Sequence, residues 1–351
     1  MLLNLVRLRY SDTPEFLSIS AISSQMNYRV IAGIGGDFGN VEESDSAFLA
    51  PNVSGSISES PTVTFVPKHD QAFVRQLISP IPLDSVFLLS YYGWGIDRIL
   101  RLFARDLNGL DNSLRHASAM AGVNDGLAEF AAIARAMGVA ERQRELGFAI
   151  VPREQPVSPA LSSALLTPAA AIAAAQAGYR IGGTEDDPKL MERTSSLIFW
   201  VSEEFQQSAE FGVLAQKLSL PLDRRRFEVA PSSGIPAPSE GRLLIEPRSP
   251  AAVLSYLARA VDVPRAHSDQ FNIAIDRSRR ELLGDLLNVR VSEKPQEAAW
   301  LQVPYRGHYF YIESGDVASR QTLSLAGAFL RLTLKSDDGS FVPVVTLPVG
   351  L

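Results

Sequence analysis

The sequence contains no cysteine among its 351 residues. Disulfide bonds, thiolate catalysis, zinc–thiolate sites and iron–sulfur clusters are therefore excluded. The sequence also has no uninterrupted apolar run of about 18 residues, the length that indicates a transmembrane helix. Its first nine residues lack the basic start and the small-residue cleavage site of a signal peptide, so we do not expect one in this numbering.

Basic charge is scarce as well. The formal net charge is -6, whereas general nucleic-acid binding needs a basic footprint. Arg224-Arg225-Arg226 is the only run of three basic residues, and we predict that it forms a solvated turn. A hydrophobic fraction of 46% and a charged fraction of 21% are typical of a packed globular protein. We therefore expect no nucleic-acid partner.

Catalytic and metal-binding signatures are missing too. There is no G-x-S-x-G motif, and the four histidines, His69, His116, His267 and His308, are far apart with no histidine two to five positions away. The glycines at positions 33–39 are followed by acidic residues and not by a helix that could hold a phosphate. We therefore assign no catalytic residue, cofactor or metal site, and we favour a non-enzymatic role.

The clearest positive feature is an alternating stretch within residues 16–67. Two long segments alternate apolar and polar residues with a period of two, which is typical of β-strands with one apolar face. An acidic connection at positions 37–45 joins them, and no Lys or Arg occurs from position 30 to 67. The stretch is predicted to form one long β-hairpin. Its apolar positions are Ile22, Met26, Tyr28, Val30, Ile34, Val53, Ile57, Val63 and Phe65.

Three interpretations of this hairpin remain open. Both segments exceed the 9–11 residues of a membrane-crossing strand, so one hairpin per protomer could contribute to a shared membrane β-barrel. The same pattern suits an oligomerisation arm, or a sheet packed within one chain. Ser24, Gly36, Gly55 and Glu59 interrupt the apolar positions, which weighs against the membrane interpretation.

The remaining sequence predicts an α+β fold in three parts. Residues 1–67 form the N-terminal segment and long hairpin, residues 68–146 form a helical module, and residues 147–351 form a mixed α/β domain with a flexible loop at 230–240. Helical spacing predicts a helix over residues 96–107 that Asn108-Gly109 stops, and a helix over 125–137 that Gly138 ends. A terminal strand is predicted at 342–349.

A second, shorter hairpin is predicted where Tyr305-Arg306-Gly307-His308 turns into an aromatic strand. Alternation places Tyr309 and Tyr311 on one face and His308, Phe310 and Ile312 on the other. Packing of a hairpin core is the favoured interpretation. The candidate ligand surface consists of Tyr305, Arg306, His308, Tyr309 and Tyr311.

Seven segments of the sequence form a distinctive set: 4–14 (NLVRLRYSDTP), 60–67 (SPTVTFVP), 73–77 (FVRQL), 93–94 (GW), 108–109 (NG), 305–312 (YRGHYFYI) and 346–350 (TLPVG). Together they resemble an uncharacterised family of proteobacterial envelope proteins. Many members of this family begin with a lipoprotein-type export signal, so the resemblance implies export and association with the outer membrane. The sequence lacks the lipidated cysteine of such proteins, and the resemblance transfers no catalytic residue.

These observations predict a non-enzymatic cell-envelope component that forms a homo-oligomer through the long hairpin, as an outer-membrane pore or scaffold. The envelope location comes from the resemblance, on the periplasmic side of the outer membrane or inserted in it. The alternative is a soluble α+β binding or enzymatic domain whose pocket lies near residues 305–312.

Overall fold

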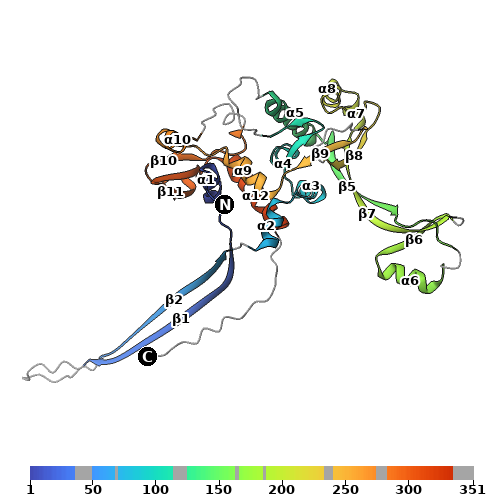
Figure 1. Cartoon of the computed structure of the whole chain (residues 1–351). Helices are drawn as coiled ribbons and strands as arrows, with labels where there is room; N and C mark the ends of the chain where they lie inside the picture. The colour runs from blue at the N-terminus through green and yellow to red at the C-terminus, as the bar shows by residue number, and fades with distance from the viewer. Residues whose placement is uncertain are drawn as a thin grey trace, which may run out of the picture. The chain divides into compact units, whose positions relative to one another are not determined.

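The computed structural model describes residues 1–35, 50–67, 70–113, 125–162, 166–184, 187–232, 240–273 and 283–334 (Figure 1). For residues 18–35 and 50–67 it describes the backbone alone. The chain divides into a main unit, Met1–Pro14 with Ala72–Lys335, and a ribbon unit, Glu15–Gln71 with Ser336–Leu351. Helices occur together with mixed sheets, which confirms the predicted α+β class.

The elements follow one another in mixed order along the chain. The helices are α1 (Leu2–Arg9), α2 (Gln71–Ile78), α3 (Leu83–Tyr91), α4 (Ile96–Phe103), α5 (Asp125–Arg142), α6 (Pro168–Gln176), α7 (Glu203–Gln206), α8 (Ala209–Lys217), α9 (Pro250–Ala258), α10 (Arg265–Phe271) and α12 (Val317–Thr333). The strands are β1 (Leu17–Gly35), β2 (Ala50–Pro67), β3 (Ala104–Leu107), β4 (Leu110–Asp111), β5 (Leu146–Pro156), β6 (Tyr179–Thr184), β7 (Asp187–Val201), β8 (Arg226–Pro231), β9 (Leu243–Pro247), β10 (Arg290–Ser292), β11 (Ala299–Tyr305) and β12 (His308–Glu313).

The larger sheet of the main unit has the strand order β4-β3-β9-β8-β7-β5, with β6 paired to β7. Its neighbouring strands are antiparallel except β8 and β9, which are parallel. Buried phenylalanines join α3 to three of these strands. The Phe87 and Phe148 rings stack at 3.9 Å, Phe148 lies 5.3 Å from Phe199, and Phe199 lies 5.9 Å from Phe227. This run of aromatic contacts fixes α3 on the sheet.

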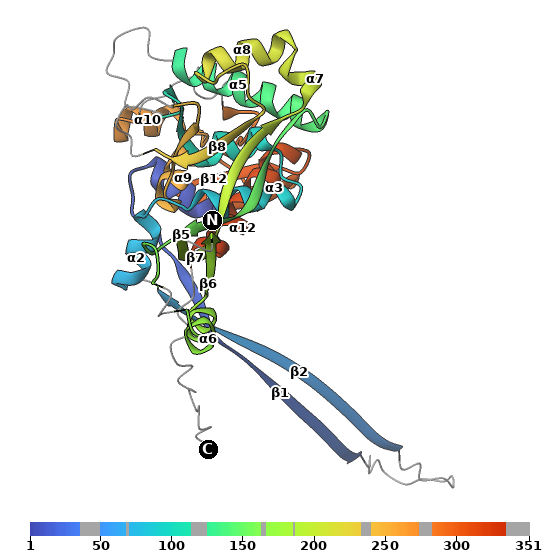
Figure 2. The same ribbon diagram turned by 90° about the vertical axis from the view of Figure 1, so that its right-hand side faces the viewer.

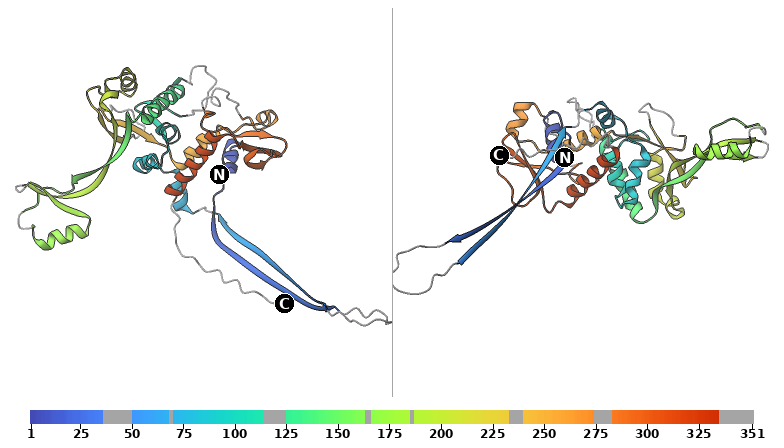
Figure 3. Two further views of the ribbon diagram at one scale, coloured as in Figure 1. Left: turned by 180° about the vertical axis from the view of Figure 1, so that it is seen from behind. Right: turned by 90° about the horizontal axis from the view of Figure 1, so that it is seen from below.

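A smaller antiparallel sheet, in the order β10-β12-β11, lies beside the N-terminal helix. Helix α1 buries Leu2, Leu5 and Val6 and contacts α9 and β11. The long C-terminal helix α12 (red in Figure 3) packs against α3 and α9. The first residues of the chain are therefore part of the main unit, whereas the sequence-based division placed them with the hairpin and separated residues 68–146 from 147–351.

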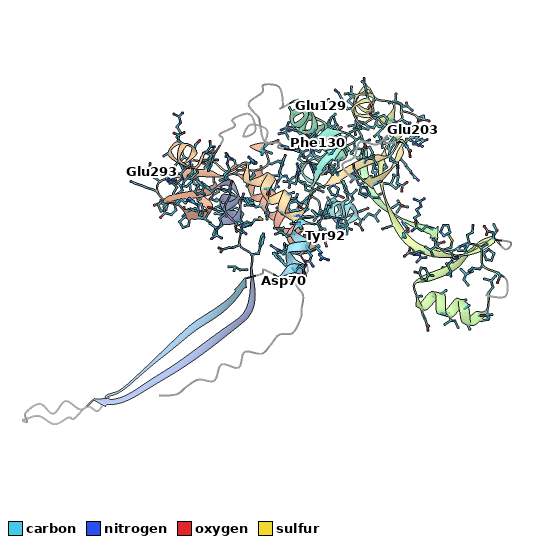
Figure 4. The ribbon with its side chains drawn as sticks, viewed as in Figure 1. Asp70, Tyr92, Glu129, Phe130, Glu203 and Glu293 are labelled. Atoms are coloured by element: carbon cyan, nitrogen blue, oxygen red, sulfur yellow. The ribbon has the colours of Figure 1, made fainter. Side chains whose placement is uncertain are left out.

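An extension of the larger sheet has no core of its own. Strands β5 and β7 continue as a pair to Pro156 and Met191, and β6 and α6 lie at their far end (Figure 2). No residue of 151–162, 166–184 or 187–196 is buried, and we call these residues the distal arm. By contrast, Phe130 of α5 is buried in the main unit, where side chains are dense (Figure 4). Helix α6 begins after a capping residue, because Thr167 accepts a hydrogen bond from the Ala170 N–H and Pro168 occupies the first turn.

In the ribbon unit, β1 pairs antiparallel with β2 from Leu17 opposite Pro67 to Gly35 opposite Ala50. The register shifts once, between Ile19 and Ala21. Among the described residues these two strands form a sheet of their own. The acidic connection, most of the predicted 230–240 loop and the predicted 342–349 strand lie outside the described residues.

The helices of the described part are short or only partly apolar. No single helix there has both the length and the apolar composition to cross a membrane. Helices α2 and α3 meet the criteria only as a pair, and they are bent by 72° at the break between them.

The predicted helix over residues 96–107 is wrong at its C-terminal end. Helix α4 ends at Phe103, and residues 104–107 are strand β3. The last turn of a helix leaves carbonyl groups without intrahelical donors, and here distant residues supply the donors. The Arg101 carbonyl accepts from the side chains of Asn112 and Arg248, the Leu102 carbonyl accepts from the Arg248 side chain, and the Phe103 carbonyl accepts from the Arg248 backbone N–H.

Asn108 and Gly109 form the turn between β3 and β4 instead of stopping a helix. Their φ values are 48° and 90°, and Leu107 pairs with Leu110 across them. Two successive positive φ values are those of the two-residue turn for which Asn-Gly is the preferred sequence. The Asn108 side chain also accepts from the Leu244 N–H and donates to the Leu218 and Arg242 carbonyls. The turn is thereby attached to β9.

Gly138 does not end helix α5, which continues to Arg142. A Cβ atom at position 138 would lie 2.8 Å from Asp97 Cβ and 3.0 Å from Asp97 Cγ, so glycine permits the close approach of α4. One turn later, Glu141 accepts a hydrogen bond of 2.8 Å from the Ile96 N–H at the start of α4. The glycine therefore marks a helix contact and not a helix boundary.

Replacing Gly138 with alanine tests this contact. The higher helix propensity of alanine would stabilise an open site by about 1 kcal/mol, but overpacking costs about 1–3 kcal/mol. We expect Gly138→Ala to lower the free energy of unfolding, measured by urea denaturation. Gly212 in α8 is the matched control, because a Cβ there meets nothing within 4 Å. Equal effects of Gly138→Ala and Gly212→Ala would contradict the close-approach explanation.

Candidate functional site

The 305–312 segment forms the hairpin predicted from the sequence. Tyr305 pairs with His308, and Arg306 and Gly307 form the two-residue turn with φ values of 46° and 77°. Phe310 and Ile312 are fully buried, as the alternation predicts for one face. Arginine rarely adopts a positive φ, and such strain persists only where the surroundings hold it. The contacts of the Arg306 side chain are therefore informative.

Those contacts belong to a group of rings at the hairpin turn. Tyr10 closes the C-terminal end of α1, and its ring lies 5.7 Å from His267, 5.8 Å from Phe271 and 5.5 Å from Tyr305. We call Tyr10, His267, Phe271, Tyr305, Arg306 and His308 the Tyr10 cluster. Helix α10 supplies His267 and Phe271, and the hairpin supplies the last three residues. The cluster thus combines the chain's N-terminal helix with two elements of its C-terminal third.

Two of the histidines that are distant in the sequence meet in this cluster. The imidazole centroids of His267 and His308 are 4.6 Å apart, at an interplanar angle of 73°. His69 and His116 lie outside the described residues. In the part of the chain that the structure describes, no group of three or more His, Asp or Glu residues is placed to hold a metal ion.

Arg306 lies between a carboxylate and aromatic rings. Its Nη2 atom is 2.9 Å from Asp12 Oδ2, and the Tyr305 hydroxyl donates to the same oxygen. The Arg306 guanidinium lies 4.6 Å from the Phe271 centroid, within the range of a cation–π interaction. The hydrogen bonds from Tyr305 and Arg306 lower the pKa of Asp12. Asp12 therefore remains ionised and holds Arg306 over the rings.

Tyr10 and His267 form the polar link of the cluster. The Tyr10 hydroxyl is 2.8 Å from His267 Nδ1, and burial raises the pKa of Tyr10 to about 12. The Tyr10 hydroxyl therefore stays protonated and can donate to Nδ1 of a neutral His267. Desolvation, followed by the charges of His308 and Arg306, lowers the pKa of His267. The neutral imidazole suits this arrangement, because a protonated ring has no acceptor nitrogen.

The structure divides the candidate ligand surface. Tyr305, Arg306 and His308 belong to the Tyr10 cluster, whereas Tyr309 and Tyr311 lie on β12 opposite Ser292 and Arg290 of β10. Sequence reasoning missed Tyr10, Asp12 and Phe271 as members. Tyr10 and His267 are 257 positions apart, so no local pattern could reveal their contact. Chemically, the cluster offers a guanidinium, two imidazoles and aromatic rings to a planar or anionic group.

The long ribbon is the second candidate site, and its backbone register places apolar positions opposite one another. Ile22 is opposite Val63, Tyr28 is opposite Ile57, and Ile19 is opposite Phe65. The register shift between Ile19 and Ala21 inserts one extra residue in β1. Ile19 therefore lies on the same face of the ribbon as the even-numbered positions that follow it. The remaining predicted positions are also paired: Met26 opposite Glu59, Val30 opposite Gly55, Ile34 opposite Pro51 and Val53 opposite Ala32.

Comparisons with known proteins found no matching family model, no matching curated protein and no matching solved structure.

The pKa of His267 predicts a pH-dependent stability. The unfolded chain, with a histidine pKa near 6.5, binds a proton more readily than the folded chain, so the free energy of unfolding falls as the pH drops below about 7. Asp12 does not contribute in this range, because its lowered pKa makes its contribution disappear only in stronger acid. We expect thermal denaturation between pH 7.5 and 5.5 to show a smaller loss of Tm in His267→Gln than in the wild type. A His267 pKa at or above 6.5 in an NMR titration would contradict the proposed role of the neutral ring.

Proposed function

We propose that the chain is a non-enzymatic cell-envelope component that assembles into a homo-oligomer through the β1–β2 ribbon and acts as a pore or scaffold at the outer membrane. The proposal rests mainly on one observation. Strands of 19 and 18 residues pair only with each other in the described part of the chain. A two-stranded sheet is at best marginally stable in water, and its outer edges carry backbone groups that can pair with further strands. In a homo-oligomer, the ribbons of neighbouring copies of this chain would pair with these edges.

The composition of the ribbon supports this assembly. Its register gathers apolar residue types at alternate positions, while Ser54, Ser56 and Ser58 occupy the intervening positions of β2. A subunit contact would bury the first set and leave the second set in water. The envelope location is supported by the resemblance to the envelope-protein family described above, of which we propose that the chain is a member.

Lysine substitutions at neighbouring positions separate the two faces. Tyr28→Lys places a charge at an apolar position opposite Ile57, and Asn27→Lys is the control at a polar position opposite Ser58. We expect Tyr28→Lys to raise the subunit dissociation constant by at least about tenfold, a change of about 1.4 kcal/mol, and Asn27→Lys to leave it nearly unchanged. Mass photometry in detergent measures both, and equal behaviour of the two variants would argue against a directional ribbon contact.

The wild-type protein provides the more basic test. A monodisperse monomer with and without detergent would reject assembly altogether. Deleting residues 22–58 should abolish assembly and leave the main unit folded, as followed by circular dichroism. An oligomer that survives this deletion would show that another surface organises the subunits.

A second candidate function, binding of a small ligand at the Tyr10 cluster, is favoured by the 4.6 Å approach of His267 and His308 beside Arg306. Benzoate is a suitable probe, because its ring can stack on aromatic side chains and its carboxylate can pair with Arg306. We expect benzoate to shift the His308 imidazole resonances in a saturable manner, and His308→Asn to weaken binding by about tenfold, the equivalent of one charge-assisted contact. Resonances that do not move at millimolar benzoate would remove this candidate.

A further inference from the structure

A cavity of about 410 Å³ lies where β9 leads into α9. Its lining includes Arg105 of β3, Glu246 of β9, Arg248, Ser249 at the start of α9, and Ser255 and Arg259 farther along the chain. Among the described lining residues three are arginines, one is an acid, and four are apolar: Ile78, Pro80, Pro247 and Ala252. None of the lining residues belongs to the ribbon or to the Tyr10 cluster.

Arg248 is an unusual cation in this cavity, because it exposes only 5% of its surface. Its Nη1 atom donates to the carbonyls of Arg101 and Leu102, and its Nη2 atom donates to the carbonyl of Asn112. Its hydrogen-bond acceptors are thus carbonyl groups, and no carboxylate among the described residues is hydrogen-bonded to it. The guanidinium stacks on Tyr256 at 4.0 Å. A buried charge without an opposite charge is costly, and burial lowers the pKa of Arg248 to about 10.

The one acidic residue among the described lining residues, Glu246, is already ion-paired. Glu246 Oε1 lies 2.9 Å from Arg105 Nη1, on the opposite strand β3. Asp111 and Glu246 act on Arg248 only through space. The N-terminal end of α9, with Ser249 as its cap, adds the positive end of a helix dipole to the same wall. The cavity therefore combines a buried guanidinium held by carbonyl groups, the positive end of a helix dipole and room for a ligand.

We propose that this cavity binds a phosphate group, with Arg248 at its base and Arg105 at its rim. A phosphate matches the forked donors of guanidinium groups, and its negative charge balances the buried charge of Arg248, whose hydrogen-bond partners are carbonyl groups. The volume exceeds that of inorganic phosphate, so a phosphomonoester or a lipid headgroup fits the same chemistry. The inference does not depend on assembly through the ribbon.

Inorganic phosphate is the first probe, titrated into the full chain by calorimetry at ionic strength matched with chloride. Substitution of Arg248 would remove its hydrogen bonds to the Leu102 and Asn112 carbonyl groups and one of the two that the Arg101 carbonyl accepts, so the test uses the rim. Ser255→Glu places a competing carboxylate in the cavity at an exposed helical position, and Ser324→Glu on α12 is the matched control. We expect Ser255→Glu to weaken phosphate binding at least about tenfold, as expected for loss of a charge-assisted contact, and Ser324→Glu to retain wild-type binding.

A second pair of variants identifies the arginines involved. Arg105→Gln should also weaken phosphate binding, whereas Arg224→Gln should not. Arg224 belongs to the basic triplet that lines a different cavity with Trp200, so it is the alternative place for an anion. Loss of binding in Arg224→Gln with normal binding in Arg105→Gln would overturn the assignment.

Vesicles containing 30% phosphatidic acid distinguish the source of the phosphate. Binding of such vesicles that Ser255→Glu weakens, together with weak binding of inorganic phosphate, would support a lipid headgroup as the source. Binding of inorganic phosphate alone would support a soluble ligand. If neither probe binds in a manner that Ser255→Glu weakens, the site does not exist.

Discussion

The end of helix α4 is the constraint on which the main unit depends. Four successive carbonyl groups there, from Arg101 to Ala104, receive hydrogen bonds from Arg248 or Asn112. A buried polar group without a partner costs about 1–3 kcal/mol, and a whole domain is stable by only about 5–15 kcal/mol. The two side chains thus determine where α4 ends, where β3 begins and how α9 lies against both. Asn112 is itself held by the Tyr256 hydroxyl, so the network closes on α9.

The same network explains the electrostatic contrast between the two arginines. Arg101 is buried but pairs with Asp285 through two hydrogen bonds of 2.8 and 2.6 Å, and Arg135 of α5 shares that carboxylate. Arg248 has carbonyl partners instead and keeps its positive charge at the base of a cavity. Carbonyl groups satisfy hydrogen-bond donors without neutralising the charge. One arginine therefore stabilises the fold as a member of an ion pair, and the other combines a structural role with the capacity to bind an anion.

Sequence patterns identified the features that are determined locally. The turn at Arg306-Gly307 and the alternation of Phe310 and Ile312 follow from residues a few positions apart. The end of α4 could not be identified, because its donors lie in other elements. Asn108-Gly109 did carry a usable signal, but an Asn-Gly pair between apolar residues indicates a hairpin more strongly than a helix stop. The Tyr10 cluster depends on contacts across most of the chain, which no local pattern encodes.

The distance along the chain between α4 and its stop affects how the protein is made. Arg248 follows Arg101 by 147 residues, and synthesis proceeds at about 5–20 residues per second. For several seconds after α4 leaves the ribosome, the residues that end it do not yet exist, while the local sequence favours continuing the helix to Leu107. The interval is longer still for Tyr10, because its partner His267 follows it by 257 residues. The nascent chain therefore has no complete core until more than two thirds of it has been translated.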